Sequence, residues 1–156
     1  MHAEINAFVK TLQQKKLTLA LAESVTCGMA THKLATCKGT SEVLAGSVIC
    51  YTPEVKKKLL KVPAATIDKC TCESKQVTEI LSRNLAKLIK ADIHAAITGL
   101  AAKGGSETKE KPVGTIFFSV SYKNKTYGFR RLFRGSPQTI KEKACLELYR
   151  SILKVI

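Results

Sequence analysis

Residues 17–28 read LTLALAESVTCG, an apolar run that ends in a cluster of polar side chains. The almost uninterrupted run from Leu17 to Ala22 is typical of a strand that is buried on both faces, as in the middle of a parallel sheet. Glu23, Ser24 and Thr26 stand where this strand ends, and the carboxyl ends of strands are where ligands gather in open α/β sheets. The same residues also suit a capped turn without chemistry, so both interpretations stay open here.

The segment after Thr26 repeats apolar residues at helical spacing until Gly39, and Thr26 is the expected N-cap of that helix. A helix that begins there leaves backbone N–H groups unpaired near Ser24. Such groups bind anions and stabilise a developing oxyanion, so this turn is a candidate reaction site.

The rest of the chain alternates helical and strand patterns. We expect further helices over 3–16 and 74–90 and from positions 53 and 137 onward, a loop or short helical turn over 62–72, and strands over 43–51, 93–98, 113–122 and 126–133. This order predicts an α/β fold, a three-layer α/β/α sandwich around a mixed, mostly parallel sheet with a C-terminal antiparallel hairpin. The length predicts one domain, residues 1–156.

The chain carries a strong excess of positive charge, with a formal net charge of +14. Only five of its 26 cationic residues are Arg, at positions 83, 130, 131, 134 and 150. Arg, more than Lys, clamps phosphate and reads guanine, so this excess indicates a solvated basic surface rather than specific nucleic-acid recognition. Nonspecific contact with nucleic acid stays open.

Six cysteines are scattered along the chain, and its three His residues do not form a metal-ligand cluster with them. We therefore expect reduced thiols, with no metal and no cofactor. No segment has the length and apolarity of a membrane span, and the first residues lack the apolar core of a signal peptide. We expect a cytoplasmic protein without membrane contact, and a homo-oligomer, because α/β domains of this size often pair.

Lys56 lies in the opening turns of the helix that starts at Thr52-Pro53. The positive end of the helix dipole and the neighbouring Lys57 and Lys58 disfavour a charged amine, so Lys56 is a candidate general base. The other two lysines fit a solvated face.

The longest irregular stretch is GLAAKGGSETKEKP, residues 99–112. It comes close to a phosphate-binding loop, but Gly105 replaces the Lys that such a loop needs. A flexible polar loop after a buried strand is still a common place for a ligand clamp. His94, inside the preceding strand, is expected to be a packed, hydrogen-bonded core residue.

Four blocks, in this order and at matching spacing, resemble the CinA C-terminal domain family. They are AESVTCG at 22–28, YTPEVK at 51–56, TGLA at 98–101 and EKPVGT at 110–115. The resemblance covers residues 17–150 and implies a nicotinamide-nucleotide amidohydrolase, which deamidates nicotinamide mononucleotide to nicotinic acid mononucleotide and ammonia without a metal. It also implies a pyridine nucleotide as the small-molecule partner, and a stand-alone form without the larger domain that precedes this one in full-length CinA.

Carboxamide hydrolysis needs a nucleophile, a base and oxyanion donors. The resemblance implies Ser24 as nucleophile, with Ser41 in reserve, and Lys56 as the base that later protonates ammonia. The helix N–H groups after Thr26 would hold the oxyanion, and Tyr51 would position Lys56 or stack on the pyridine ring. Substrate contacts would come from Glu23, Gly28, Thr98, Gly99, Gly104, Gly105 and Lys111, the last as a counter-charge to phosphate. A core-packed Tyr51 and a solvated Lys111 are the alternatives.

The chain also departs from the family pattern. Cys27 replaces a Gly, Ala102-Lys103 replaces Gly-Pro, and Ser136-Pro137 replaces Asp-Arg after Gly135. Arg134 is the nearest substitute for the missing Arg. These departures leave a second hypothesis, a catalytically weakened homologue that binds a nucleotide, or nucleic acid nonspecifically through the Lys-rich surface. A weaker third hypothesis is an adaptor that docks an acidic protein.

Overall fold

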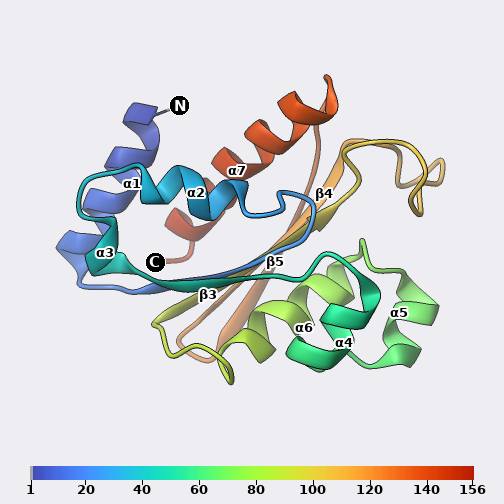
Figure 1. The fold of residues 1–156 in the computed structure, drawn as a ribbon, viewed down its shortest axis with the longest axis horizontal. Coiled ribbons are helices and arrows are strands. Elements are labelled where there is room, and N and C mark those ends of the chain that lie inside the picture. The colour runs from blue at the N-terminus through green and yellow to red at the C-terminus, as the bar shows by residue number, and fades with distance from the viewer. Residues whose placement is uncertain (1) are drawn as a thin grey trace.

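The computed structural model describes residues 2–156 and arranges them as one mixed sheet between two layers of helices (Figure 1). The sheet order is β2-β1-β3-β4-β5. β2, β1 and β3 are parallel, whereas β4 is antiparallel to β3 and β5 to β4. This confirms the predicted α/β architecture. The strands are β1 (Leu19–Glu23), β2 (Leu44–Ile49), β3 (Ile93–Gly99), β4 (Thr115–Tyr122) and β5 (Lys125–Leu132).

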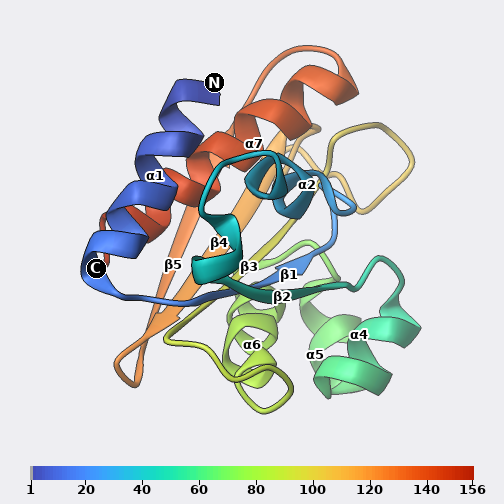
Figure 2. The same ribbon diagram turned by 60° about the vertical axis from the view of Figure 1, so that its left-hand side comes forward.

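Helices cover both faces of the sheet (Figure 2). One face carries α1 (His2–Lys15), α2 (Met29–Ala35), α3 (Thr40–Val43) and α7 (Pro137–Leu153), and the other carries α4 (Pro53–Leu60), α5 (Ala64–Cys70) and α6 (Lys75–Leu85). β1 contributes to both cores, because Leu19 and Leu21 pack with the first layer and Ala20 and Ala22 with the second. Each buried Leu contributes about 2 kcal/mol. The apolar run is therefore a two-sided strand, as predicted.

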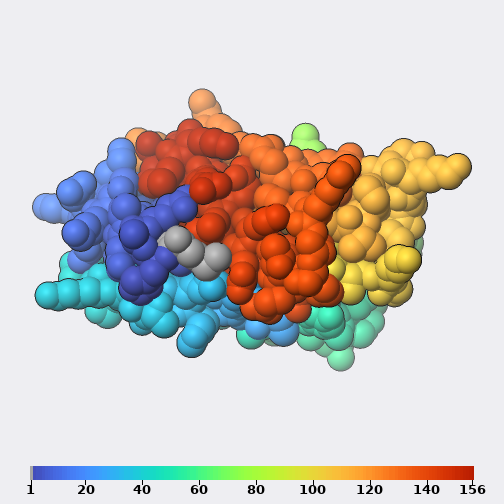
Figure 3. Space-filling view, turned by 90° about the horizontal axis from the view of Figure 1, so that it is seen from above, coloured from blue at the N-terminus to red at the C-terminus, as the bar shows by residue number. Residues whose placement is uncertain are grey.

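The terminal helices α1 and α7 lie side by side (Figure 3). The ring of Phe8 stacks on that of Tyr149, with 4.9 Å between centroids. At the surface, Arg150 Nε donates to Glu4 Oε1 at 2.6 Å. The Tyr149 hydroxyl also donates to the Ala30 carbonyl at 2.6 Å, so α7 is joined to α2 as well.

Local signals placed three helix starts correctly. The hydroxyls of Thr52, Ser74 and Ser136 each accept a hydrogen bond from the backbone N–H three residues later. The helix ends were less accurate. The helix predicted over 74–90 ends at Leu85, and the N–H groups of Lys87 and Leu88 bond three rather than four residues back.

The strand predicted over 43–51 is also shorter than expected, because the left-handed Gly39 starts the short helix α3 that runs to Val43. None of the helices within residues 2–156 is long and apolar enough to cross a membrane.

Candidate active site

The buried carboxylate of Glu23, at the end of β1, organises the turn that follows the strand. Its Oε2 accepts hydrogen bonds from Thr26 Oγ1 at 2.6 Å, Gly28 N at 3.0 Å and Ala30 N at 3.1 Å. Its Oε1 accepts from Thr31 N at 2.7 Å and Thr31 Oγ1 at 2.5 Å. A carboxylate at the start of a helix is also stabilised by the helix dipole. Glu23 therefore holds the turn together, and its carboxylate is occupied by the protein itself.

The prediction that Thr26 caps the next helix is wrong. The N-cap is Gly28, which has no side chain to offer, and the Thr26 hydroxyl donates to Glu23 instead. The sequence rule considers only a cap next to the helix, whereas Glu23 reaches the same N–H groups from the preceding strand. The sequence suggested that these helix N–H groups would bind an oxyanion. They are not free to do so, because they donate to Glu23.

Two other N–H groups take their place beside Ser24. Ser24 N donates to Ile97 O and Cys27 N donates to Ser24 O, both at 3.1 Å. Between them, the N–H groups of Val25 and Thr26 have no acceptor among residues 2–156. Two successive free N–H groups directly after a hydroxyl are the arrangement that an oxyanion site requires.

Ser24 lies against the amine of Lys56, which is fully buried. Lys56 Nζ is 3.0 Å from Ser24 Oγ, 2.6 Å from the Cys50 carbonyl oxygen and 2.9 Å from the Tyr51 carbonyl oxygen. The sheet brings these groups together, because Glu23 pairs with Ile49 in the parallel β1–β2 ladder and α4 starts shortly after β2. Parallel pairing thus places the two predicted catalytic side chains in direct contact.

The three partners of Lys56 suit a proton acceptor. No carboxylate is among them, and a neutral amine has two N–H donors and one lone pair. In the structure Nζ donates to Ser24 Oγ as well as to the two carbonyl oxygens; without that third proton, the carbonyl oxygens hold the two remaining N–H groups and the lone pair faces the Ser24 hydroxyl. This geometry allows the amine to take the hydroxyl proton.

Cys50, next to these groups, is not a competing nucleophile. Burial raises the pKa of its thiol to about 11, and its Sγ donates weakly to the Glu23 carbonyl at 3.5 Å. Because the thiolate is the reactive form, Cys50 stays unreactive at neutral pH.

Ser24 opens onto a pocket of about 270 Å³. Tyr51, which is 65% exposed, lines the same pocket, as do the loop glycines Gly99, Gly104 and Gly105. The structure therefore brings together five of the residues predicted for the site, with Lys56 directly behind Ser24. A larger hollow of about 470 Å³ lies at the other end of β3, away from Ser24 and Lys56.

The loop after β3 requires glycine at its start. Gly99 has φ +155°, and an added Cβ would lie 2.6 Å from the Thr115 carbonyl oxygen. Further along, Gly104 N and Gly105 N donate to Oε1 and Oε2 of Glu107, each at 2.9 Å. These bonds, chiefly that from Gly104, hold the pKa of Glu107 below its ordinary value. The two glycine N–H groups thus already bind an anionic group, the loop's own carboxylate.

Several predicted substrate contacts lie elsewhere. Thr98 is fully buried, and its hydroxyl pairs with that of Thr78 at 2.8 Å. Lys111 Nζ donates to Thr71 Oγ1 at 2.6 Å and Ser106 Oγ at 2.8 Å, and burial lowers its pKa. Lys111 therefore fastens the Gly-rich loop to the segment before α6. Neither residue lines the pocket, and Glu23 and Gly28 do not line it either.

The reserve nucleophile Ser41 is at the wrong edge of the sheet. It lies exposed on α3, which precedes the amino end of β2, whereas Ser24 and Lys56 lie near the carboxyl end of that strand. A six-residue strand is about 20 Å long, so Ser41 cannot share a reaction centre with Lys56.

Two lysines of the pocket were missed by the sequence analysis. Lys103 and Lys141 line it together with Pro137, whereas Arg134, the expected substitute for the family's Arg, does not. Lys141 follows Pro137 by four residues on α7, so helical periodicity puts both on one side of the helix. That spacing was the available signal. Among residues 2–156 there is no group of three or more His, Cys, Asp and Glu side chains placed to hold a metal ion.

The three-layer fold agrees with the family comparison. The CinA C-terminal domain matches residues 2–156, and the chain belongs to that family. A CinA-like protein from Fusobacterium nucleatum is 35% identical over 145 residues, which cover 93% of this chain and 35% of that protein. A putative competence-damage inducible protein from a Geobacillus species is 40% identical over 113 residues, 72% of this chain and 27% of that protein. The chain thus spans about a third of such relatives.

Solved structures agree with the fold. The competence damage-inducible protein A from Klebsiella pneumoniae superposes with a TM-score of 0.90 at 27% identity, over 97% of this chain and 94% of that one. A CinA superfamily protein from Escherichia coli superposes with a TM-score of 0.92 at 24% identity, over 98% of this chain and 88% of that one. At that identity, the second likeness supports the fold alone.

Proposed function

We propose that this chain is a metal-independent amidohydrolase that converts nicotinamide mononucleotide to nicotinic acid mononucleotide and ammonia. The observation that carries the proposal is the 3.0 Å contact between Ser24 Oγ and the buried amine of Lys56 in the wall of a pocket. A hydroxyl and an amine in such contact form a nucleophile and its base, which acyl transfer from a carboxamide requires.

The reaction begins when Ser24 Oγ attacks the carboxamide carbon while the neutral amine of Lys56 takes the hydroxyl proton. The carbonyl oxygen becomes an oxyanion, which accepts hydrogen bonds from the N–H groups of Val25 and Thr26. The Lys56 ammonium then protonates the departing nitrogen, the C–N bond breaks, and ammonia leaves an ester on Ser24. A water molecule, deprotonated by the same amine, hydrolyses that ester and returns the serine.

The charge of the pocket suits a substrate phosphate. Lys103 and Lys141 line it against a single carboxylate residue, Glu73. The N–H groups of Gly104 and Gly105 add two donors once Glu107 is displaced. In this proposal Lys141 takes the role that the sequence analysis gave to Lys111. The Tyr51 ring, at the pocket mouth, stacks on the pyridine.

The test is ammonia release from nicotinamide mononucleotide by the purified chain, with a chelator present, beside Ser24→Ala and Lys56→Met. Ser41→Ala is the matched control, since it removes a hydroxyl at the other edge of the sheet. The proposal expects chelator-resistant release that both site variants abolish and the control keeps. Absence of release by the unmodified chain contradicts it, and nucleotide titration then tests the weakened, binding-only homologue.

A further inference from the structure

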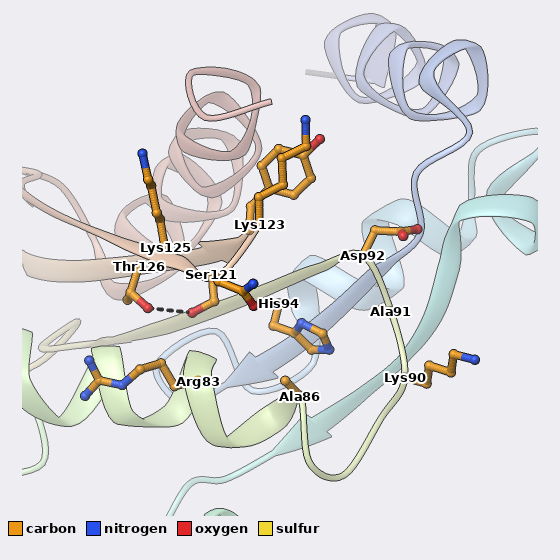
Figure 4. Close-up of a pocket in the computed structure, with 12 residues that line it drawn as sticks. Arg83, Ala86, Lys90, Ala91, Asp92, His94, Ser121, Lys123, Lys125 and Thr126 are labelled. Atoms are coloured by element: carbon orange, nitrogen blue, oxygen red, sulfur yellow. Dashed lines mark hydrogen bonds between the residues drawn. The ribbon is translucent and has the colours of Figure 1, made fainter.

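The larger hollow, of about 470 Å³, lies between the C-terminal end of α6, the start of β3 and the turn that joins β4 to β5 (Figure 4). β3 runs from this hollow to the Ser24 pocket, and a seven-residue strand spans about 23 Å, so the two sites are separate. Seven titratable side chains line it: Arg83, Lys90, Asp92, His94, Tyr122, Lys123 and Lys125.

The charge of this hollow is unbalanced. Among residues 2–156, none of its four cations has a carboxylate oxygen within 4.0 Å. Its single acid, Asp92, is already engaged, because its Oδ2 accepts from Thr18 N at 2.8 Å and from Thr18 Oγ1 at 2.6 Å. Lys123 Nζ lies 5.2 Å from the centroid of the Tyr122 ring. Cations around a concave surface that have no carboxylate partner attract an anionic ligand.

Uncharged polar groups lie between the cations. His94 is only 6% exposed, and its Nε2 lies 2.8 Å from the Ile89 carbonyl oxygen, so Nε2 carries a proton. Its Nδ1 has no partner among residues 2–156 and, in the neutral ring, accepts a hydrogen bond. The hydroxyls of Ser121 and Thr126, 3.1 Å apart, line the hollow beside it, as Figure 4 shows. These groups suit ligand hydroxyls.

We propose that this hollow is a second binding site, for a phosphorylated sugar, either free or as part of a mononucleotide. The volume is within the range of about 300–1,000 Å³ that small-molecule sites occupy. Arg83, on α6, and Lys125, whose side chain starts on the opposite face of the sheet, bind the phosphate from the two sides of the β4–β5 edge, and His94 with the Ser121–Thr126 pair binds sugar hydroxyls. A small ligand fits a concave site between three segments better than an extended nucleic acid does, since the latter needs a continuous groove.

The experiment titrates the full chain with ribose 5-phosphate, adenosine monophosphate and inorganic phosphate in separate calorimetric runs. Arg83→Gln and Lys125→Gln test the site. Lys87→Gln is the matched control, because it removes one exposed positive charge beside the hollow without lining it. Thermal melting checks that each variant is folded. We expect saturable binding that each site variant weakens about fivefold, as for a partly exposed charged hydrogen bond, and the control by less than twofold. Tighter binding of adenosine monophosphate than of ribose 5-phosphate identifies the ligand as a nucleotide, and equal binding identifies the sugar phosphate itself.

Four results overturn the proposal. One is the absence of saturable binding of either sugar phosphate. Another is equal weakening by Lys87→Gln, since that indicates a diffuse surface charge. The third is binding lost in Lys141→Gln but kept in Arg83→Gln, which assigns the probe to the Ser24 pocket. A single-stranded oligonucleotide that binds more tightly than any mononucleotide, with all lysine variants equally affected, also overturns it in favour of nonspecific nucleic-acid binding.

Discussion

Replacement of Lys56 by Met tests the proposed chemistry most directly, because Met fills the same buried space without a nitrogen. A general base contributes about 10²–10⁴ in rate, so we expect ammonia release from nicotinamide mononucleotide to fall by about that factor, or roughly 3–5 kcal/mol of transition-state stabilisation. The loss should appear in kcat, since Lys56 lies behind Ser24 and does not line the pocket.

The same variant should still fold. The Cys50 and Tyr51 carbonyls each lose a donor at the end of β2, which costs about 1–3 kcal/mol per buried group. Removing a fully buried amine from the core offsets part of that cost. Urea unfolding should therefore show a net destabilisation smaller than the roughly 2–6 kcal/mol that the two carbonyls alone would cost, with a folded baseline without urea, so that lost activity is not lost structure.

A double variant sharpens the test. If Ser24 and Lys56 act as one unit, Ser24→Ala combined with Lys56→Met should be no slower than the slower single variant. The reasoning fails if folded Lys56→Met keeps more than a tenth of the activity, or if the two losses multiply.

Three further variants and one change of pH address the residues that support the site. Glu23→Gln leaves one acceptor oxygen and turns an amide N–H₂ toward backbone donors, so we expect about 2–5 kcal/mol of destabilisation in urea unfolding; an unchanged midpoint contradicts this. Glu107→Gln weakens the bonds by which the Glu107 side chain competes with substrate for the Gly104 and Gly105 N–H groups, so KM for nicotinamide mononucleotide should fall. The control is Glu110→Gln, which alters an exposed carboxylate of the same loop and should leave KM unchanged. Because the pKa of Glu107 lies below its ordinary value in the folded chain, its hydrogen bonds persist at neutral pH and are lost only as pH falls through that lowered value. The protection factors of the two glycine amides, which correct for the slower intrinsic exchange in acid, should fall there and not before. Gly99→Ala places a methyl group against a backbone oxygen, and we expect about 1–3 kcal/mol of destabilisation with reduced kcat; wild-type stability would refute the steric argument.

The sequence predicted best what depends on neighbouring residues. The apolar run at 17–22 was sufficient for a two-sided strand, and the hydroxyls of Thr52, Ser74 and Ser136 were sufficient for helix starts. Parallel pairing then required the ends of β1 and β2 to meet. The contact between Ser24 and Lys56 follows from these local rules and one rule of topology.

Residues whose role depends on distant partners were assigned less well. Lys111 bonds to Thr71, 40 residues earlier, and this choice between loop fastening and phosphate binding has no local signal. Ser41 matched a sequence pattern, but the extra helix α3 fixes it at the amino edge of β2. The sequence suggested Glu23 as a site residue because it is polar and ends a strand. Its five hydrogen bonds could not be predicted, because they form only in the folded turn between β1 and α2.

The position of β1 between β2 and β3 has a consequence for how the chain folds. β1 pairs with β2, which follows shortly, and with β3, which follows much later; the Thr18–Asp92 hydrogen bonds join residues 74 positions apart. Closing a loop of that length costs about 4 kcal/mol of chain entropy before the pairing repays it. On the ribosome roughly 5–20 residues are added each second, so one edge of β1 stays unpaired for about 4–15 seconds until β3 has been synthesised. The strand that positions Ser24 therefore exposes one unpaired apolar edge during synthesis, until β3 completes the pairing.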